Sequence, residues 1–209
     1  MSTLSTQLTW SHYCELLPIK DINIINYYID ITIKQNLSVR ELRNKIKSKE
    51  YERLDDKTKY KLMVQDKENI EDFIKNPILI KNSYKDIISE KLLKQLILED
   101  MDNFLSELGE GFSYIKNEYK IKLGDRYNYI DLLLFNYKYN CFVVVELKVT
   151  ELKKEHIGQI QLYMNYIDKN IKEIHQDKTI GIIICKRDNV FVMEYCSDKR
   201  IYRAIYECI

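Results

Sequence analysis

The residues of this 209-residue chain that could do chemistry together lie between positions 131 and 163. Asp131 is a lone carboxylate in the apolar segment YNYIDLLLF, and Glu146 and Lys148 stand near the end of a second apolar segment, CFVVVELKV. In a β-strand, residues two apart project from the same face, so Glu146 and Lys148 are expected to lie side by side. An acid and a base are thereby placed together at a strand end.

The two apolar segments are separated by a short polar connection, Tyr137 to Asn140, which would join them as an antiparallel pair. Asn136 would then oppose Cys141, the paired residue numbers would sum to 277, and Asp131 would oppose Glu146. A slip of one residue would put the two carboxylates on opposite faces of the sheet. The register is therefore a prediction that the structure can refute.

Two carboxylates that face each other across adjacent strands repel, and Lys148 compensates only one of the two charges. A divalent cation would resolve the conflict. Oxygen ligands from Asp131, Glu146 and the backbone carbonyl of Leu147, completed by waters, suit Mg²⁺ or Mn²⁺ and leave room for phosphate oxygens. We expect such a metal to polarise a phosphodiester and acidify a bound water, while Lys148 orients that water or neutralises charge on the phosphoryl group.

The tripeptide Glu-Leu-Lys is also common at solvated strand ends, so this interpretation depends on residues outside it. Gln159 and Tyr163 lie four apart in the helical segment HIGQIQLYMNYIDKNIK and therefore share one helix face. An amide and a phenol can hold a phosphate or a water without altering the charge balance, although the spacing alone also fits ordinary interfacial residues. Glu107 and Glu118 are the candidates for an additional acidic ligand, and the sequence does not choose between them.

The elements that must position these residues follow residue 80. An amphipathic helix is predicted over 86–108, and Gly109 and Gly111 stop it. Three strands are predicted to form an antiparallel meander, at 112–123, 127–135 and 141–149. After the helix that carries Gln159, the pattern predicts strands at 179–185 and 190–195 and a helical or irregular segment at 199–208. This order, αβββαββ, indicates an α/β or α+β domain.

The first 80 residues have a different character, because all five glycines of the chain follow residue 108. The segments 22–34 and 39–54 have helical periodicity, and Ser38 followed by Glu41 forms a capping box at the start of the second helix. Asn76-Pro77 disfavours helical geometry before the proline, so the domain boundary is placed near residue 80. We expect an all-α domain at 1–80 and a mixed domain at 81–209.

The helix that begins at Val39 carries several basic residues, among them Arg40, Arg43 and Lys47. They could make phosphate contacts from a recognition helix. Acidic residues interrupt this charge, so a solvated face of a helical interaction domain is an equal alternative.

The composition of the chain excludes several classes of protein. The 33 basic and 32 acidic residues give a net charge of +1, so any nucleic-acid contact must come from a local patch. The 17 tyrosines could be stacking platforms for bases, but an AT-rich genome is the simpler explanation. No apolar run is long enough for a membrane span and no signal peptide is evident, which predicts a cytoplasmic protein. The five cysteines form no metal-binding spacing and are expected to be reduced, structural thiols.

The order Asp131, Glu146-Leu147-Lys148, then Gln159 and Tyr163, resembles the PD-(D/E)XK nuclease superfamily, and QIQLY resembles the Q-x-x-x-Y motif of its exonuclease-like branch. A closer similarity is to the YhcG-like family of these nucleases. It is carried, in the family's order, by LTWSHYCELL, NLSVRELRNKI, FLSELGEGFSYI, YIDLLLF, ELKV, GQIQLYMNYID and TIGIIIC. Together these stretches cover most of the chain.

This resemblance implies a helix-turn-helix-like N-terminal domain and a restriction-endonuclease-like core with a mixed sheet flanked by helices. It also implies Asp131 and Glu146 as metal ligands, Lys148 as the catalytic lysine, and Gln159 and Tyr163 as supporting residues. The chain departs from the pattern at Ile130, which replaces the proline of the superfamily name. It departs again at 116–118, where Lys-Asn-Glu stands in place of the Gly-Arg-Gln of the family.

The sequence thus favours a Mg²⁺-dependent nuclease that acts on DNA, in repair, recombination or defence. A catalytically silent nucleic-acid-binding or assembly module is the competing class, because a fold alone does not establish turnover. Cleavage of RNA leaves no distinct mark on the sequence and stays open. A homodimer is compatible with this reading, because cutting both strands of a duplex often needs two sites.

Overall fold

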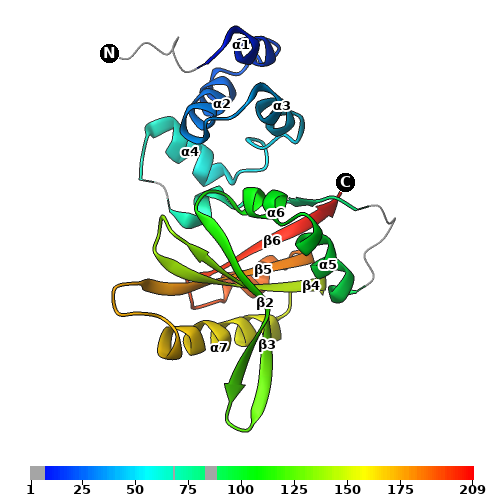
Figure 1. The fold of residues 1–209 in the computed structure, drawn as a ribbon, viewed down its shortest axis with the longest axis vertical. Helices are drawn as coiled ribbons and strands as arrows, with labels where there is room; N and C mark the ends of the chain where they lie inside the picture. Colours follow the sequence, from blue (N-terminus) through cyan, green and yellow to red (C-terminus); the bar gives the residue numbers. More distant parts are fainter. Residues whose placement is uncertain (1–7, 68, 83–88) are drawn as a thin grey trace. The chain divides into compact units, whose positions relative to one another are not determined.

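The computed structural model describes residues 8–67, 69–82 and 89–209, and the chain divides into two compact units, Met1–Asp72 and Phe73–Ile209 (Figure 1). The boundary expected at residue 80 lies further along the chain than this division. The reason is a short strand, β1 (Ile78–Ile80), which pairs in parallel with the last strand of the second unit.

The first unit is helical, as the sequence predicts. Its helices are α1 (Trp10–Leu16), α2 (Ile22–Gln35), α3 (Val39–Lys47) and α4 (Asp56–Val64), followed by the 3₁₀ turn η2 (Ile70–Phe73) at the boundary. The break between α2 and α3 forms because Asn36 adopts the left-handed conformation and ends α2. Ser38 and Glu41 form the predicted capping box at the start of α3, with Glu41 N donating to Ser38 Oγ at 3.3 Å. The helix ends at Lys47, earlier than the predicted residue 54, and α4 was not predicted.

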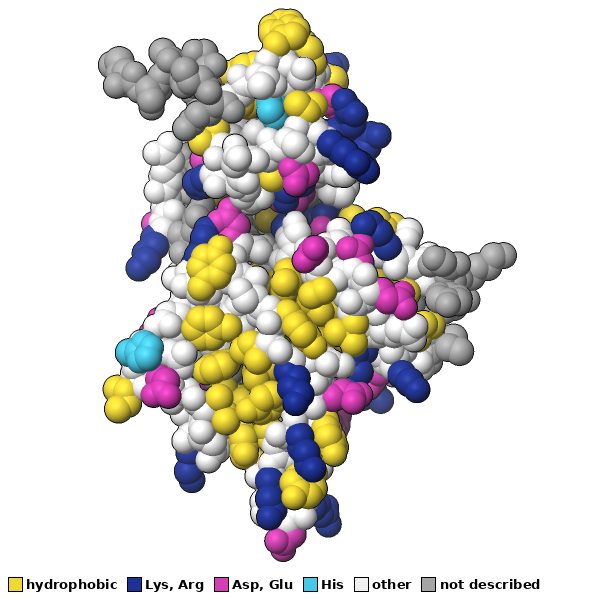
Figure 2. All heavy atoms as spheres, in the orientation of Figure 1, with side chains coloured by type: hydrophobic (Ala, Val, Ile, Leu, Met, Phe, Trp, Pro, Cys, Tyr) yellow, Lys and Arg dark blue, Asp and Glu magenta, His cyan; other side chains and the backbone are white. Residues whose placement is uncertain are grey.

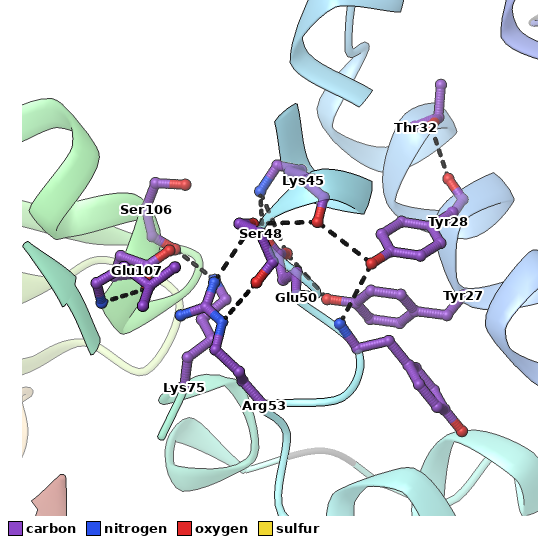
Figure 3. A network of polar contacts seen from close by, with 12 residues as sticks. Tyr27, Tyr28, Thr32, Lys45, Ser48, Glu50, Arg53, Lys75, Ser106 and Glu107 are labelled. Carbon is purple, nitrogen blue, oxygen red and sulfur yellow. Dashed lines mark hydrogen bonds and ion pairs between the residues drawn. The ribbon is translucent and has the colours of Figure 1, made fainter. Parts of the chain in front are cut away.

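A network of buried polar groups ties α2 to α3 in the first unit (Figure 3). Glu50 is only 3% exposed, and its carboxylate accepts hydrogen bonds from the Tyr27 hydroxyl at 2.9 Å and from Lys45 Nζ at 2.9 Å. The Tyr28 hydroxyl donates to the Lys45 carbonyl at 3.2 Å. The charge of Glu50 is therefore buried together with the groups that compensate it.

The second unit is a six-stranded mixed sheet with the order β1-β6-β5-β4-β3-β2. Its other strands are β2 (Phe112–Leu123), β3 (Arg126–Asn136), β4 (Cys141–Glu151), β5 (Asp177–Arg187) and β6 (Ile201–Cys208). β2, β3 and β4 are antiparallel, as predicted, whereas β4, β5, β6 and β1 are parallel to one another. The mixed sheet flanked by helices confirms the predicted fold class.

The register between β3 and β4 is the predicted one, with pairs that run from Asn136↔Cys141 to Leu132↔Val145 and sum to 277. Asn136 fixes it from the turn. Its fully buried side chain accepts from the backbone N–H of Lys138 at 3.0 Å and of Tyr139 at 3.1 Å. An Asn that bonds its own turn in this way sets the length of the connection, and the connection sets which residues face each other.

The amphipathic segment predicted as one helix over 86–108 is interrupted, and its residues 86–88 lie outside the described part of the chain. It forms α5 (Glu90–Glu99) and α6 (Met101–Leu108), separated at Asp100, whose backbone is non-helical at φ −134° and ψ 57°. Asp100 pairs with Lys81 at 2.6 Å.

Two predictions near the end of the chain are wrong. The segment 190–195, expected to be a strand, contains the short helix α8 (Val190–Glu194), whose Val190 and Phe191 are exposed. The segment 199–208, expected to be helical or irregular, forms strand β6. In β6 the buried residues Ile201 and Ala204 are three apart, which imitates a helical pattern.

The helix α7 (Lys154–Asn170) covers one face of the sheet, and α5 and α6 lie on the other side in Figure 1. The buried α7 residues Ile160 and Met164 pack on the central strands. Gly181 in β5 permits this close approach, because a Cβ there would lie 2.7 Å from Met164 Sδ and 2.8 Å from Ile160 Cδ1. Across the described part of the chain, every helix is too short or too polar to cross a membrane.

Candidate active site

Asp131 lies where β3 and β4 stop pairing, one residue beyond the last pair, Leu132↔Val145. Its Oδ2 accepts a hydrogen bond from the backbone N–H of Leu147 at 3.0 Å. The carboxylate thus replaces the strand–strand hydrogen bond and reaches across to β4. This contact places Asp131 beside the segment Glu146-Leu147-Lys148.

Glu146 is the most buried acid of the group, with 1% exposure. Its Oε2 accepts from Lys148 Nζ at 3.3 Å and from Gln159 Nε2 at 3.1 Å. Its Oε1 is buried and has no hydrogen-bond partner among the described residues. Burial, together with the negative charge of Asp131, raises the pKa of Glu146 to about 7.

Lys148 lies beside Glu146, as its spacing predicts, and is 8% exposed. Burial alone would lower the pKa of this lysine, but the charges of Glu146, Glu90 and Asp131 outweigh burial and raise it. Lys148 therefore keeps its positive charge. A further acid that the sequence did not predict at this site, Glu90, also lies near Lys148, with its Oε2 3.7 Å from Lys148 Nζ.

Gln159 and Tyr163 share one face of α7, and Gln159 Nε2 also donates to the Tyr163 hydroxyl at 3.2 Å. Tyr163 is 4% exposed, and burial raises the pKa of its phenol, so it stays neutral. His156, nearer the start of α7, accepts from the N–H of Lys153 through Nδ1 at 3.2 Å and caps the helix. Its pKa is lowered by burial and by the positive charge of Lys148.

Two residues of the site escaped the sequence reasoning: Glu90 and Lys94, which lie one turn apart on α5. Lys94 Nζ bonds Asp131 Oδ1 at 3.1 Å and Glu118 Oε1 at 3.0 Å, so a lysine bridges the two acids. The available signal was the cap at Ser89, which accepts from Leu92 N at 3.2 Å and fixes the start of the helix. Glu90 and Lys94 follow this cap four residues apart, so they lie on the same side of the helix. This polar side contrasts with the buried side of α5, which packs on the sheet.

The two candidates for an additional acidic ligand lie in different surroundings. Glu107 is buried in α6, and its carboxylate accepts from the backbone N–H of Leu79 in β1 at 2.9 Å. Glu118 is linked to Asp131 through Lys94 and is 60% exposed at its side chain. Glu118 is therefore the one of the two that lies next to the Asp131 cluster.

The residues present fit a divalent cation. Glu146 Oε1 is a buried carboxylate oxygen in need of a positive partner. The N–H of Leu147 points at Asp131, and because the N–H and C=O of one strand residue point to the same edge, its carbonyl faces Asp131 as well. Two carboxylates and a carbonyl are hard oxygen donors of the kind that Mg²⁺ binds. Within the described residues, no three His, Cys, Asp or Glu side chains converge as a metal site, so waters or phosphate oxygens would complete the shell.

Comparison with known families decides what this constellation is related to. A model described as the YhcG PDDEXK nuclease domain matches residues 71–207. The chain belongs to this family. A second model, the DUF1016 N-terminal domain, matches residues 1–53, within the helical unit. The resemblance to the YhcG-like family stated from the sequence is confirmed.

Among curated relatives, the YhcG-family chain is 26% identical over 192 residues to "Putative nuclease YhcG" of Escherichia coli strain K12. The match covers 88% of this chain and 51% of the relative, so the chain spans about half the length of that protein. Among solved structures, a repair endonuclease from Pyrococcus abyssi is 20% identical, with a TM-score of 0.41 and coverage of 59% of this chain and 48% of that one. The EndoMS–dsDNA2 complex is 17% identical, with a TM-score of 0.43 and the same coverages, 59% and 48%.

The basic residues singled out in the helical unit of this YhcG-family protein differ in their surroundings. Arg43 is held by Glu15, with Nη2 to Oε1 at 2.6 Å and Nε to Oε2 at 3.1 Å. Arg40 and Lys47 are exposed on α3. The ion pair with Glu15 therefore engages one of the three charges that the sequence offered for phosphate contacts.

Proposed function

We propose that this chain is a Mg²⁺-dependent nuclease that hydrolyses phosphodiester bonds of DNA, with Mn²⁺ as a substitute metal. The observation that carries the proposal is the convergence of Asp131, Glu146 and Lys148 at the end of the β3–β4 pairing. Glu146 is buried there, and its Oε1 has no hydrogen-bond partner within the part of the chain that the structure describes. A buried carboxylate beside a second, partly buried one is unfavourable for a purely structural role. The arrangement is suited to receive a cation and a phosphate.

Asp131 and Glu146 would hold the metal through their carboxylates, and Leu147 through its backbone carbonyl. When bound, the ion would supply Lewis acidity, which polarises the phosphate and lowers the pKa of a water. The protein's own contribution is to hold these oxygens in place before the substrate arrives. Gln159 does so for Glu146 by donating to Oε2, and the Leu147 N–H does so for Asp131.

Lys148 would act on the substrate directly. It stays protonated beside Glu146, so its ammonium group can neutralise negative charge that develops on the phosphoryl oxygens or orient the attacking water. The neutral hydroxyl of Tyr163 offers a further hydrogen bond without adding charge. Charge stabilisation by preformed groups is the main contribution expected in phosphoryl transfer.

The helical unit would add affinity through α3, in the manner of a helix-turn-helix. Arg40 and Lys47 are exposed and can contact phosphates, whereas Arg43 must first leave Glu15. Such contacts position a protein on nucleic acid without reading sequence.

The test is cleavage of labelled linear duplex, circular duplex, single-stranded and branched DNA and of RNA, with Mg²⁺, Mn²⁺ or EDTA. Wild-type protein is compared with Asp131→Ala and Lys148→Ala. Lys178→Ala, at an exposed lysine near the start of β5, is the control for loss of a lysine away from the site. We expect metal-dependent cutting of DNA that Asp131→Ala and Lys148→Ala abolish and Lys178→Ala preserves.

Four outcomes contradict the proposal. Metal-independent cutting, or cutting that survives in Lys148→Ala, would remove the assigned site. Binding of DNA without cleavage of any substrate would favour a catalytically silent module. Cleavage of RNA alone would replace DNA as the substrate. Sedimentation of the protein on a duplex would show whether two copies assemble around one substrate.

A further inference from the structure

The β2–β3 hairpin continues well beyond the candidate active site and projects from the sheet unit (Figure 1). Its two strands pair from Asn117↔Leu132 to Leu123↔Arg126, and Gly124 makes the turn with φ +59°. Asp131 lies at the base of this hairpin, next to the end of the β3–β4 pairing. The hairpin is therefore a direct extension of the strand that carries the first acid of the site.

The two faces of the hairpin have different chemistry. On one face Ile121 and Ile130 are 1% and 0% exposed and belong to the cluster that packs with α7. On the other face lie two lysines and two tyrosines that are exposed to solvent. They are Lys120, Lys122, Tyr127 and Tyr129.

The exposed face alternates aromatic and cationic groups across the two strands. Lys122 pairs with Tyr127 and Lys120 pairs with Tyr129 in the register. Lys120 Nζ lies 3.7 Å from the centroid of the Tyr127 ring, which shows that the two side chains share one face. Basic and hydrophobic side chains follow one another along this hairpin in Figure 2. The two phenol rings are 55% and 53% exposed, so packing of the fold does not account for them.

Charge also gathers here. The outer part of the hairpin, 119–129, carries three basic residues, Lys120, Lys122 and Arg126, and a single acid, Asp125, whereas the chain as a whole has a net charge of +1. Tyr127, Tyr129 and Asp131 are successive residues of one face of β3, roughly 7 Å apart from one to the next. This row leads from the hairpin to the acid of the candidate site.

We infer that this face of the hairpin binds a single-stranded segment of the nucleic acid as it enters or leaves the Asp131 site. Bases stack on Tyr127 and Tyr129, and Lys120 and Lys122 contact the intervening phosphates. Exposed aromatic rings interleaved with cations are the arrangement by which proteins hold single strands without reading their sequence. A duplex would use the lysines but would leave the rings unused, because its bases are stacked on each other. The inference rests on the proposed function for what occupies the neighbouring site.

The test measures affinity for single-stranded and duplex DNA of one sequence, in EDTA so that no strand is cut. Tyr127→Ala/Tyr129→Ala is expected to weaken single-strand binding at least roughly tenfold and to change duplex binding little, since each stacked base contributes about 1–3 kcal/mol. Tyr127→Phe/Tyr129→Phe keeps the rings and is expected to restore binding. Lys120→Ala/Lys122→Ala is expected to weaken both and to reduce the salt dependence by roughly 0.7 per lost single-strand phosphate contact.

Tyr137→Ala is the matched control. Tyr137 is 64% exposed and lies in the turn between β3 and β4, at the opposite end of β3 from the hairpin turn at Gly124. Unchanged single-strand affinity in the alanine pair, or an equal loss in Tyr137→Ala, overturns the inference. An equal loss for duplex and single strand also overturns it, since stacking would then not be the cause. If the wild type cuts DNA and the alanine pair binds single strands normally, the inference is wrong and the proposed function stands. If binding depends on the rings but the wild type never cuts, the proposed function is wrong and the inference stands.

Discussion

Two buried glutamates, one in each unit, show how differently a carboxylate can be buried. Glu50 and Glu146 are 3% and 1% exposed. Glu50 has Tyr27 and Lys45 as donors to its Oε1, and Lys45 again to its Oε2 (Figure 3). Glu146 has Lys148 and Gln159 at Oε2, no partner at Oε1 within the described part of the chain, and the charge of Asp131 nearby.

Burial by itself therefore does not distinguish a structural acid from a candidate functional one in this protein. The difference is whether the surroundings complete the hydrogen bonds and charge of the carboxylate. Glu50 is completed and fastens α2 to the end of α3, so it stabilises the fold. Glu146 is left incomplete, which is unfavourable for stability and favourable for binding a cation. The same substitution, Glu to Gln, should accordingly have opposite effects at the two positions.

The largest expected effect is on activity. Glu146→Gln removes a charge from the proposed metal site and is expected to lower the cleavage rate at least about 10³-fold. Glu50→Gln leaves that site intact and is expected to cleave at the wild-type rate, provided that the assay temperature lies well below unfolding. Rates on one duplex substrate in Mg²⁺ compare the two. Equal rates for both variants would break the contrast.

Stability should change in the reverse order. Glu50→Gln leaves the ammonium of Lys45 without its buried counter-charge and is expected to cost about 3 kcal/mol. Glu146→Gln removes a desolvated charge that Asp131 repels, and Lys148 keeps the negative charges of Glu90 and Asp131 nearby. This variant is therefore expected to leave the sheet unit as stable or more stable in EDTA. Hydrogen exchange separates the two units, with amides of α2 and α3 reporting the first variant and amides of β4 and β5 the second. Faster exchange in β4 and β5 of Glu146→Gln would show that Glu146 is a structural acid after all.

The pH dependence follows from the raised pKa of Glu146. The folded protein holds a proton up to about pH 7 that the unfolded chain releases near 4.5, so the folded state binds more protons in this window. The free energy of unfolding in EDTA should therefore fall as pH rises from 4.5 to 7, by about 1.4 kcal/mol per unit from this group. Glu146→Gln should lack this contribution, and the difference between the two unfolding curves isolates it. Parallel curves for wild type and variant would contradict the assignment.

Much of the sheet unit could be predicted because its signals are local. Alternating apolar strands, the four-residue turn and the helix periodicity of 156–172 predicted β2, β3, β4 and α7 and the register between β3 and β4. The end of the chain could not be predicted in this way, because β6 is a strand only through its parallel neighbours β5 and β1. Pairing with distant segments overrides a local pattern in which Ile201 and Ala204 look helical.

The candidate site shows the same division. Residue spacing predicted that Glu146 lies beside Lys148 and that Gln159 and Tyr163 share a helix face, since both follow from the geometry of one element. It did not find Glu90 and Lys94, because α5 is more than thirty residues earlier and only the folded sheet brings it to Asp131. Side chains supplied by another element leave no mark in the motif itself.

The smallest effect expected here concerns Lys94, whose ammonium lies 3.1 Å from Asp131 Oδ1 and 3.0 Å from Glu118 Oε1. Lys94 therefore gives Asp131 a cationic partner of the kind that Glu146 Oε1 does not have among the described residues, and it would compete with the proposed metal for the Asp131 carboxylate. Lys94→Met keeps much of the side-chain volume and removes the competing cation. It should tighten Mn²⁺ binding several-fold, as measured by calorimetry. The effect is small because partial exposure reduces, without abolishing, the attraction between Lys94 and Asp131.

Lys91→Met is the matched control for Lys94→Met, because Lys91 is exposed on the same helix. Its Mn²⁺ affinity should equal that of the wild type. Weaker Mn²⁺ binding in Lys94→Met would mean that Lys94 supports the geometry of Asp131 instead of competing for it. In that case Asp131 would resemble Glu50 more than Glu146, because it too would depend on a fixed partner from the protein.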